Sequence, residues 1–334
     1  MIPENLQKQI DFIADRCEEI KPIVVISCIT FNHELYLKDA LEGFVNQKTN
    51  FPYVAIVHED ASTDKTADIL KKYAEKYPNI IFPIYEKENQ YSKKDGSLYN
   101  IINKAIDASN PKYVALCEGD DYWNDPHKLQ KQVDFLDFHD DYTLCATNHL
   151  YQYPDGKKTE SPYNVNEDRD SDIKEVILKG GMFLSTSSLV IRKEAYNKLP
   201  ESATKLPVGD YPLQIYMAYL GKVRILYAST VVYRVQSNGS WSAKYSMDDF
   251  KTKFCLFNYA KEINSTMNQV TKFEYNKIFE EYIIIREFNL YFKYSPLKEC
   301  KLLFKRPVTI FKRLGIRKVI FSILPIKIKN LILK

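Results

Sequence analysis

Val114-Ala115-Leu116-Cys117-Glu118-Gly119-Asp120-Asp121-Tyr122-Trp123 is the stretch around which the rest of the chain is organised. Its first four residues are apolar and predict a buried strand, which ends in three carboxylates within four positions. Carboxylates this close raise one another's pKa unless a cation lies among them, so one interpretation is a site for a hard metal ion. The other is a solvated acidic turn before a helix that begins at Asp125-Pro126, and this fragment alone favours neither.

The composition predicts a globular protein with a sizeable core. The chain has 334 residues, of which 45% are hydrophobic and 13% aromatic, while only 10 are glycine. The formal net charge of +4 conceals an asymmetry, because residues 290–334 carry 12 Lys and Arg against one acid, Glu299. The positive charge is therefore a property of the C-terminal segment, and the rest of the chain is net negative.

The cysteines and the N-terminus predict a cytoplasmic protein. Six cysteines are scattered singly without CxxC spacing, as expected for buried free thiols in a reducing compartment. The first residues lack a charged segment followed by an apolar core, so no secretion signal is expected. No stretch reaches the roughly 18 uninterrupted apolar residues of a membrane span.

Apolar runs alternate with helical patterns in the first third of the chain. An amphipathic helix is expected over residues 4–20, and it is followed by predicted strands at 23–29, 53–58, 80–85 and 113–117. The first run is β-branched and does not alternate with polar residues, which is typical of a parallel strand buried on both faces. The pattern predicts an α/β fold with a mostly parallel, Rossmann-like sheet and a site at the carboxyl ends of its strands.

The second half is less regular. We expect an antiparallel strand at 142–151, a long surface loop at 152–172, a strand at 182–192, a loop at 200–209 and, after a helix, a strand at 223–233. From Asp248 onward the pattern predicts helices only. We therefore divide the chain into an N-terminal helix (1–22), a catalytic α/β domain (23–245) and a helical, basic C-terminal region (246–334).

Five polar motifs follow one another in a fixed order. They are Ile26-Ser27-Cys28-Ile29-Thr30-Phe31-Asn32, Glu59-Asp60-Ala61-Ser62-Thr63-Asp64, Glu118-Gly119-Asp120-Asp121-Tyr122-Trp123, Gly209-Asp210-Tyr211-Pro212 and Tyr233-Arg234-Val235-Gln236. Together they resemble a family 2 inverting glycosyltransferase with the GT-A fold, of the type found in bacterial polysaccharide biosynthesis. The resemblance covers roughly Ile23 to Trp241.

The resemblance implies a divalent cation, Mn²⁺ or Mg²⁺, that neutralises the leaving diphosphate of a nucleotide-sugar. Glu118 and Asp120 match the first and third positions of the family's DxD element. Asp120 would bind the metal, and Glu118 with Gly119 would lie near the nucleotide. Asp121 would contact the sugar or the ligands of the metal, although a helix cap is the alternative. Glu118 in place of the leading Asp is a departure that keeps the charge.

The nucleotide pocket, by the same resemblance, is lined by residues of the first two motifs. Those residues are Thr30, Phe31, Asn32, Glu34 and Asp60. A carboxylate such as Asp60 suits the N3–H of a uracil-like base. Lys93 and Lys94 follow in a polar loop and would approach the diphosphate, but a solvated lysine pair is the alternative.

Asp210 is the candidate general base, because an inverting transfer needs a carboxylate on the acceptor side to take the hydroxyl proton. The alternative is a helix N-cap before Pro212. Many relatives carry His where this chain has Gln236, which would be a weaker metal ligand. Arg234 would contact a phosphate or the substrate, or else form a structural ion pair.

Two further expectations concern carbohydrate and metal chemistry. Tyr122 and Trp123 offer flat faces for stacking sugar rings, although Trp123 suits the core equally well. The five histidines show no paired metal spacing, so a zinc site is not expected.

The C-terminal residues 298–334 interleave apolar and basic side chains. This pattern suits peripheral contact with an anionic membrane, here the inner face of the plasma membrane, and it fits a lipid-linked acceptor. A helical lid with a solvated basic face is the alternative. Nucleic acid is not expected as a partner, because the apolar content is too high for an arm that follows phosphates.

The sequence therefore predicts a metal-dependent transferase that moves a sugar from a nucleotide-sugar, expected to be a UDP-sugar, to a glycan or lipid-linked acceptor in cell-surface polysaccharide synthesis. The departures at Glu118 and Gln236 leave open a non-catalytic module that binds nucleotide-sugar or carbohydrate. A metal-dependent nucleotidyltransferase is a third, weaker interpretation.

Overall fold

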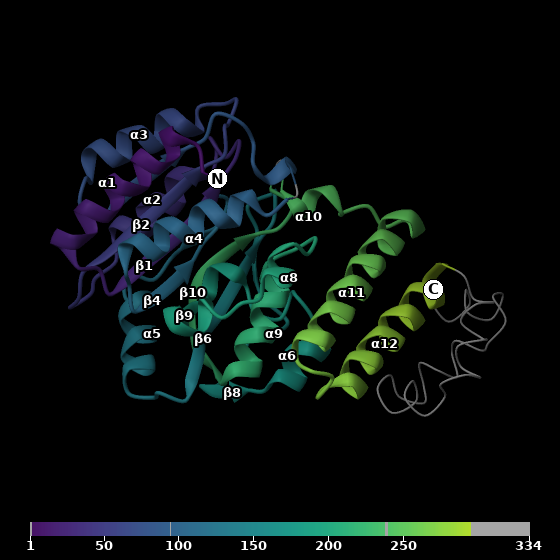
Figure 1. Cartoon of the computed structure of the whole chain (residues 1–334). Coiled ribbons are helices and arrows are strands. Elements are labelled where there is room, and N and C mark those ends of the chain that lie inside the picture. Colours follow the sequence, from purple (N-terminus) through teal and green to yellow (C-terminus); the bar gives the residue numbers. More distant parts are fainter. Residues whose placement is uncertain (1, 94, 238–239, 295–334) are drawn as a thin grey trace. The chain divides into compact units, whose positions relative to one another are not determined.

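The computed structural model describes residues 2–93, 95–237 and 240–294, which form two compact units (Figure 1). The first unit runs to Lys244 and the second begins at Tyr245. Residues 298–334, for which we expect membrane contact, lie outside the described residues. None of the described helices combines the length and the apolar character needed to cross a bilayer.

The first four strands of the first unit are parallel and stand in the order β3, β2, β1, β4. They are β1 (Val24–Thr30), β2 (Tyr53–Glu59), β3 (Ile81–Tyr85) and β4 (Tyr113–Leu116). The prediction of four strands buried within a parallel sheet is confirmed. Successive side chains of β1 enter different clusters, since Val24 and Ile26 belong to one and Val25 to the other.

Helices cover both faces of this part of the sheet (Figure 1). One cluster packs against α1 (Glu4–Ile20) and α4 (Ser97–Ser109), and the other against α2 (Leu37–Val45), α3 (Thr66–Lys76) and α5 (Lys128–Asp137). The expected N-terminal helix is α1, whose buried residues are Leu6, Ile10, Ile13 and Cys17. The helical cover on both faces explains why these strands lack polar alternation.

The sheet continues from β4 with strands of mixed direction, in the order β9, β6, β10, β5. They are β9 (Val190–Arg192), β6 (Tyr142–Gln152), β10 (Lys222–Arg234) and β5 (Tyr122–Trp123). Strand β6 is antiparallel to β9, as predicted, but it is parallel to the long β10. Mixed pairing brings the end of β10 beside β5, directly after the acidic stretch.

Two expectations in this half are wrong. Residues 152–172 contain two short strands, β7 (Lys158–Glu160) paired with β6 and β8 (Arg169–Ser171) paired with β10, and are not only a surface loop. The strand predicted at 182–192 is reduced to β9. In the residues before β9, the N–H and the hydroxyl of Ser188 both donate to Ser185 O, at 2.9 and 2.7 Å. A 3-10 turn therefore forms at Thr186–Ser188 in place of the strand.

The remaining helices of the first unit are short except for one. They are α6 (Ile173–Lys179), α7 (Lys193–Tyr196), α8 (Glu201–Thr204), α9 (Asp210–Leu220) and α10 (Trp241–Lys244). Helix α8 lies in the predicted loop at 200–209. Asp210, the candidate general base, is the first residue of α9.

In the described part of the second unit, residues 245–294, there are two helices, α11 (Phe250–Val270) and α12 (Asn276–Tyr294), as the helical pattern after Asp248 predicts. Asp249 caps α11 by accepting a hydrogen bond from the Thr252 N–H at 2.9 Å. Phe257, Leu290 and Tyr291 form a small buried cluster between the helices. The described cysteines are all free thiols, and four of the five are buried.

Candidate active site

The carboxyl ends of three neighbouring strands bring the first motifs together. Thr30 at the end of β1 stands in register with Glu59 at the end of β2. On the other side of β1, the Gly119 N–H donates to Ile29 O at 2.9 Å, which extends the β1 and β4 pairing into the acidic stretch. The sheet topology therefore assembles the predicted site at one edge.

The loops after β1 and β2 are joined by hydrogen bonds between side chains and backbone. Asn32, at φ 53°, accepts from the Thr63 N–H at 2.8 Å, and its own N–H donates to Ser62 Oγ at 2.9 Å. Glu34 accepts from the Lys65 N–H at 3.1 Å. These two predicted nucleotide residues therefore hold the two loops together, while the ring of Phe31 is 39% exposed.

Four carboxylates, those of Glu118, Asp120, Asp121 and Asp210, interact at this edge. Burial, followed by the charges of the other three, raises the pKa of Glu118 to about 8. Burial and Asp120 likewise raise the pKa of Asp121 well above its usual range. The start of α9 lies close to the acidic stretch after β4, because the neighbouring hydroxyls of Thr186 and Ser187 bond to Asp210 and Asp121. A cation placed among these groups would relieve their repulsion.

Asp121 connects the acidic stretch after β4 to β10 and to the turn at Thr186–Ser188. Its side chain is 2% exposed, and its two oxygens accept from the Ser187 hydroxyl at 2.6 Å and from the Arg234 N–H at 2.9 Å. Both oxygens are therefore engaged by the protein itself. These bonds differ from the helix-cap alternative, and the predicted contact of Asp121 with the sugar or the ligands of the metal stays a prediction.

Asp120 is half-buried and is positioned by the segment after β10. The Ser237 hydroxyl donates to Asp120 Oδ2 at 2.6 Å, and Arg234 Nη1 donates to the Asp120 carbonyl at 2.8 Å. The neighbouring Gln236 is exposed, at φ 59°. The residue that contacts the predicted metal ligand from this segment is therefore Ser237, which the sequence pattern did not single out.

Arg234 is a structural residue in this arrangement. Its guanidinium forms an ion pair with Asp39 of α2 and lies between the rings of Tyr36 and Tyr122, at 5.2 and 4.6 Å from their centroids. These contacts match the ion-pair alternative and tie β10 to α2. Tyr122 therefore stacks on an arginine in this structure.

Trp123 belongs to the core. It is 4% exposed, packs edge-on against Phe44 at 5.1 Å between ring centroids, and donates through Nε1 to Ser187 O at 2.8 Å. Its ring also lies 4.1 Å from Nζ of Lys128. The core alternative for Trp123 matches this placement, and sugar stacking does not.

Gly119 leaves no room for a side chain. A Cβ atom there would lie 2.7 Å from Thr30 Oγ1 and 2.9 Å from His33 Nδ1. Both of those atoms are buried and have no hydrogen-bond partner among the described residues. Burial lowers the pKa of His33, so its imidazole is neutral and can accept a hydrogen bond or bind a metal.

We expect Gly119→Ala to disturb the site through this contact. The added methyl group must displace Thr30 or the Glu118–Asp120 turn, at a cost of about 1–3 kcal/mol in the free energy of unfolding. Thermal denaturation and titration with UDP and Mn²⁺ should both show a loss.

The matched control is Gly156→Ala, where a Cβ meets open space and the only cost is the positive φ of 83°. That variant should lose about 1 kcal/mol of stability and keep its affinity for UDP. Full stability and full UDP affinity in Gly119→Ala would contradict the contact.

The donor set fits a hard cation that takes part of its coordination from a substrate. Among the described residues, no three His, Cys, Asp or Glu side chains converge on one point as a complete metal cage. Gly119, which lies between Glu118 and Asp120 in the chain, nevertheless contacts the orphaned Thr30 and His33 atoms, and the charge of Asp120 acts on His33. Mg²⁺ and Mn²⁺ sites commonly use one or two carboxylates and complete the shell with phosphate oxygens and water.

Asp60 is fully buried, and its carboxylate holds the loop that follows β3. It accepts from the backbone N–H groups of Gln90 and Tyr91, at 2.6 and 3.0 Å. Burial raises the pKa of Asp60, although these two donors act in the opposite direction. A base that binds Asp60 must therefore share its oxygens with this loop or displace it.

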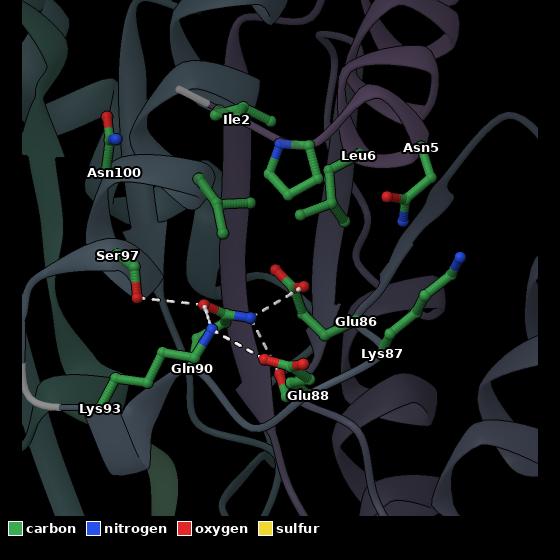
Figure 2. Close-up of a pocket in the computed structure, with 12 residues that line it drawn as sticks. Ile2, Asn5, Leu6, Glu86, Lys87, Glu88, Gln90, Lys93, Ser97 and Asn100 are labelled. Atoms are coloured by element: carbon green, nitrogen blue, oxygen red, sulfur yellow. Dashed lines mark hydrogen bonds and ion pairs between the residues drawn. The ribbon is translucent and has the colours of Figure 1, made fainter.

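The same loop is braced by the side chain of Gln90 (Figure 2). Its amide donates to Glu86 at 3.2 Å and to Glu88 O at 3.0 Å, and its oxygen accepts from Lys93 and Ser97, both at 3.1 Å. A cavity of about 350 Å³ lies between this loop and the first turns of α1 and α4. Lys93 also pairs with Glu88, and Lys94 lies outside the described residues.

Asp210 stands at the start of α9 with its carboxylate held in place. It accepts from its neighbour's N–H, that of Tyr211, at 2.7 Å and from the Thr186 hydroxyl at 3.3 Å. Burial raises its pKa toward neutrality, which suits a general base. The N-cap position is Gly209, so Asp210 is the first helical residue and not the cap.

Several residues that contact the predicted site residues, or the backbone next to them, were not predicted. They are Tyr36, Asp39, Tyr99, Thr186, Ser187 and Ser237. The hydroxyl run Ser185-Thr186-Ser187-Ser188 was the one visible signal, because polar side chains interrupted an expected strand.

Comparison with protein-family models identifies the chain. Residues 25–199, more than half of it, match the model described as glycosyl transferase family 2. The chain belongs to this family. The match contains the strand ends that carry Thr30, Asp60, Glu118 and Asp120.

Curated relatives support the assignment. An uncharacterized protein of Mycobacterium tuberculosis is 35% identical over 222 residues, which cover 66% of this family 2 chain and 61% of that protein. An uncharacterized glycosyltransferase of Nostoc sp. is 28% identical over 70% of this chain and 71% of its own. A Bacillus subtilis protein named for teichuronic acid biosynthesis is 32% identical over 35% of this chain and 42% of its own.

Solved structures share the fold. Staphylococcus aureus TarS in complex with UDP-GlcNAc has a TM-score of 0.52 at 15% identity and covers 90% of both chains. A mannosyltransferase of Pyrobaculum calidifontis in complex with GDP-Man and Mn²⁺ has a TM-score of 0.52 at 12% identity, covering 93% of this chain and 84% of its own. The expected GT-A fold is therefore confirmed, whereas identities this low carry no substrate assignment.

Proposed function

We propose that this family 2 protein transfers a sugar from a nucleotide-sugar, with a UDP-sugar as the expected donor, to a glycan or lipid-linked acceptor with inversion at the anomeric carbon. The observation that carries the proposal is that Asp210, at the start of α9, and the carboxylates that follow β4 meet at one site, where the adjacent hydroxyls of Thr186 and Ser187 bond to Asp210 and Asp121. In an inverting transfer the hydroxyl attacks the face of the sugar opposite the leaving diphosphate, so the general base and the metal site act on opposite sides of the sugar.

The carboxylates at the end of β4 divide between binding and structure. Asp120 and Glu118 would hold a divalent cation, which neutralises charge on the leaving diphosphate when bound. Asp121 and Ser237 fix the position of Asp120 through the hydrogen bonds described above. The ion pair between Arg234, whose side chain is buried, and the half-exposed Asp39 holds the end of β10 against α2.

Asp210 would take the proton of the acceptor hydroxyl at its carboxylate oxygens. The hydrogen bonds from Tyr211 and Thr186 orient the carboxylate, and its raised pKa brings it closer to the pH of the cytoplasm. A base with a pKa nearer the working pH accepts the proton more effectively in the transition state.

The nucleotide would lie over the loops after β1 and β2. Phe31 offers an exposed ring to the base, and Asp60 is the candidate acceptor for the base N3–H. Because the backbone N–H groups of Gln90 and Tyr91 already donate to the Asp60 carboxylate, we infer that binding of the sugar donor shifts the loop after β3. Protection of that loop from hydrogen exchange should therefore change when UDP is added.

The direct test is release of UDP from a panel of UDP-sugars with Mn²⁺, with Mg²⁺ and with EDTA. We expect one donor to be preferred, activity to require the metal, and the product to have the opposite anomeric configuration by NMR. Release of pyrophosphate would indicate a nucleotidyltransferase. Tight nucleotide binding without turnover on any acceptor would indicate a binding module.

The basic C-terminal segment motivates a second prediction. We propose that residues 298–334 hold the protein at an anionic membrane, where each basic residue near the surface contributes about 1 kcal/mol. A chain truncated after residue 297 should lose flotation with vesicles that contain anionic lipid. The control is neutral vesicles, to which neither form should bind strongly. Equal flotation of both forms on anionic vesicles would rule out this role.

A further inference from the structure

Tyr99 lies in the first turn of α4 but does not belong to the core face of that helix. The residues of α4 that pack against the sheet are Leu98, Ile101, Ile102, Ala105 and Ile106. Tyr99 is only half-buried and extends from the helix in another direction, toward the start of α9. Packing of the core therefore does not account for a tyrosine at this position.

The phenol of Tyr99 contacts the residue that precedes Asp210. A Cβ atom on Gly209 would lie 2.4 Å from the Tyr99 hydroxyl oxygen and 3.0 Å from its Cζ. The hydroxyl therefore rests against the backbone of Gly209, at the N-cap of the helix that carries the candidate base. Only a residue without a side chain permits this approach.

The charges around the Tyr99 hydroxyl keep it protonated. Burial, and then the charges of Glu118 and Asp210, raise the pKa of Tyr99. The phenol is therefore a neutral donor that lies against the residue before Asp210 and feels the charges of Glu118 and Asp210. Within the part of the chain that the structure describes, its hydroxyl has no hydrogen-bond partner.

We propose that Tyr99 is a specificity-determining residue, whose hydroxyl donates a hydrogen bond to a hydroxyl group of the sugar being transferred. This inference rests on the proposed function. The sugar must lie between the diphosphate side at Asp120 and the base at Asp210, and Tyr99 reaches that interval from a third element. Carboxylates that are ionised beside a bound cation only accept hydrogen bonds, so in that state Tyr99 supplies the donor.

Tyr99→Phe tests the proposal without changing the shape of the side chain. For the preferred donor among UDP-glucose, UDP-galactose and UDP-GlcNAc, kcat/KM should fall about tenfold, and the preference among the three should narrow. The affinity for UDP alone, measured by calorimetry, should stay at the wild-type value. The matched control is Tyr196→Phe, which removes a hydroxyl bonded to Asn103 of the same helix at 2.9 Å. That variant should keep wild-type kcat/KM.

Three outcomes would overturn the proposal. Unchanged kcat/KM and donor preference in Tyr99→Phe would show that the hydroxyl does not contact the sugar. An equal loss of affinity for UDP would place the contact at the nucleotide. If the wild-type protein turns over none of the donors, the proposed function fails and this inference fails with it, whereas wild-type turnover with a neutral Tyr99→Phe overturns the inference alone.

A second arm tests the geometry without any activity. In the wild-type background, Gly209→Ala places a methyl group against the Tyr99 hydroxyl, so the melting temperature should fall. In the Tyr99→Phe background that oxygen is gone and the closest remaining atom is Cζ, so the same substitution should cost less. Equal losses in the two backgrounds would contradict the contact.

Discussion

Replacing Asp210 by Asn should reduce sugar transfer by about two to four orders of magnitude while the protein still binds UDP. The amide has the shape of the carboxylate and can still accept from the Tyr211 N–H and pair with the Thr186 hydroxyl. It cannot take a proton from the acceptor. The loss should therefore appear in kcat, measured as UDP release with a saturating donor, and not in the stability of the fold.

A second aspartate at a helix start provides the control for Asp210. Asp172 precedes α6 and accepts from the Glu175 N–H at 2.8 Å, so it has the purely structural role that is the alternative for Asp210. Asp172→Asn should keep full activity and lose at most about 1 kcal/mol of stability. If Asp210→Asn behaves in the same way, Asp210 serves the helix and the base lies elsewhere.

Replacing Lys128 by Met should stabilise the protein by several kcal/mol at pH 7. Lys128 is fully buried, its Nζ has no hydrogen-bond partner among the described residues, and its main contact is the ring of Trp123. Burial lowers its pKa from 10.5 to about 7. Each unit of such a shift corresponds to about 1.4 kcal/mol of lost stability, which the contact with Trp123 offsets only in part.

The pH dependence of unfolding gives the sign of this effect. The unfolded chain holds the Lys128 proton up to about pH 10.5, whereas the folded chain releases it above about pH 7. The unfolded state binds more protons between these values, so wild-type stability should rise with pH through that window, and the destabilisation should be complete below it. Lys128→Met should lose this slope.

Lys131 of the same helix is the matched control for Lys128. It is half-exposed and pairs with Asp125 at 2.6 Å, so Lys131→Met should change stability by less than about 1 kcal/mol and keep the wild-type slope. Chemical denaturation at several pH values measures both variants. A destabilised Lys128→Met would show that the amine is charged and stabilised in the fold.

The sequence predicted the elements whose character is set locally. Strands β1 to β4 were visible because each is a short apolar run buried on both faces, and the residues at their ends followed from the topology of a parallel sheet. Asp210 was predicted because the Gly209-Asp210-Tyr211-Pro212 motif resembles the family's general-base element at a helix start. These signals need no knowledge of distant partners.

The contacts that position the site were not predictable in the same way. Ser237 for Asp120, Ser187 for Asp121 and Asp39 for Arg234 join residues far apart in the chain, and a single serine or aspartate has no periodic signature. The loop that covers Asp60 was missed because its bonds come from backbone N–H groups. The short strands β7 and β8 exist through pairing with longer neighbours.

The most direct test of the central claim is calorimetric titration of UDP, with Mn²⁺ present, into the wild-type protein, Asp120→Asn and Asp210→Asn. If Asp120 holds the cation and Asp210 is the base, Asp120→Asn should weaken UDP binding at least about tenfold, while Asp210→Asn binds as the wild type does. Wild-type affinity in Asp120→Asn, or an equal loss in both variants, would contradict this division of roles.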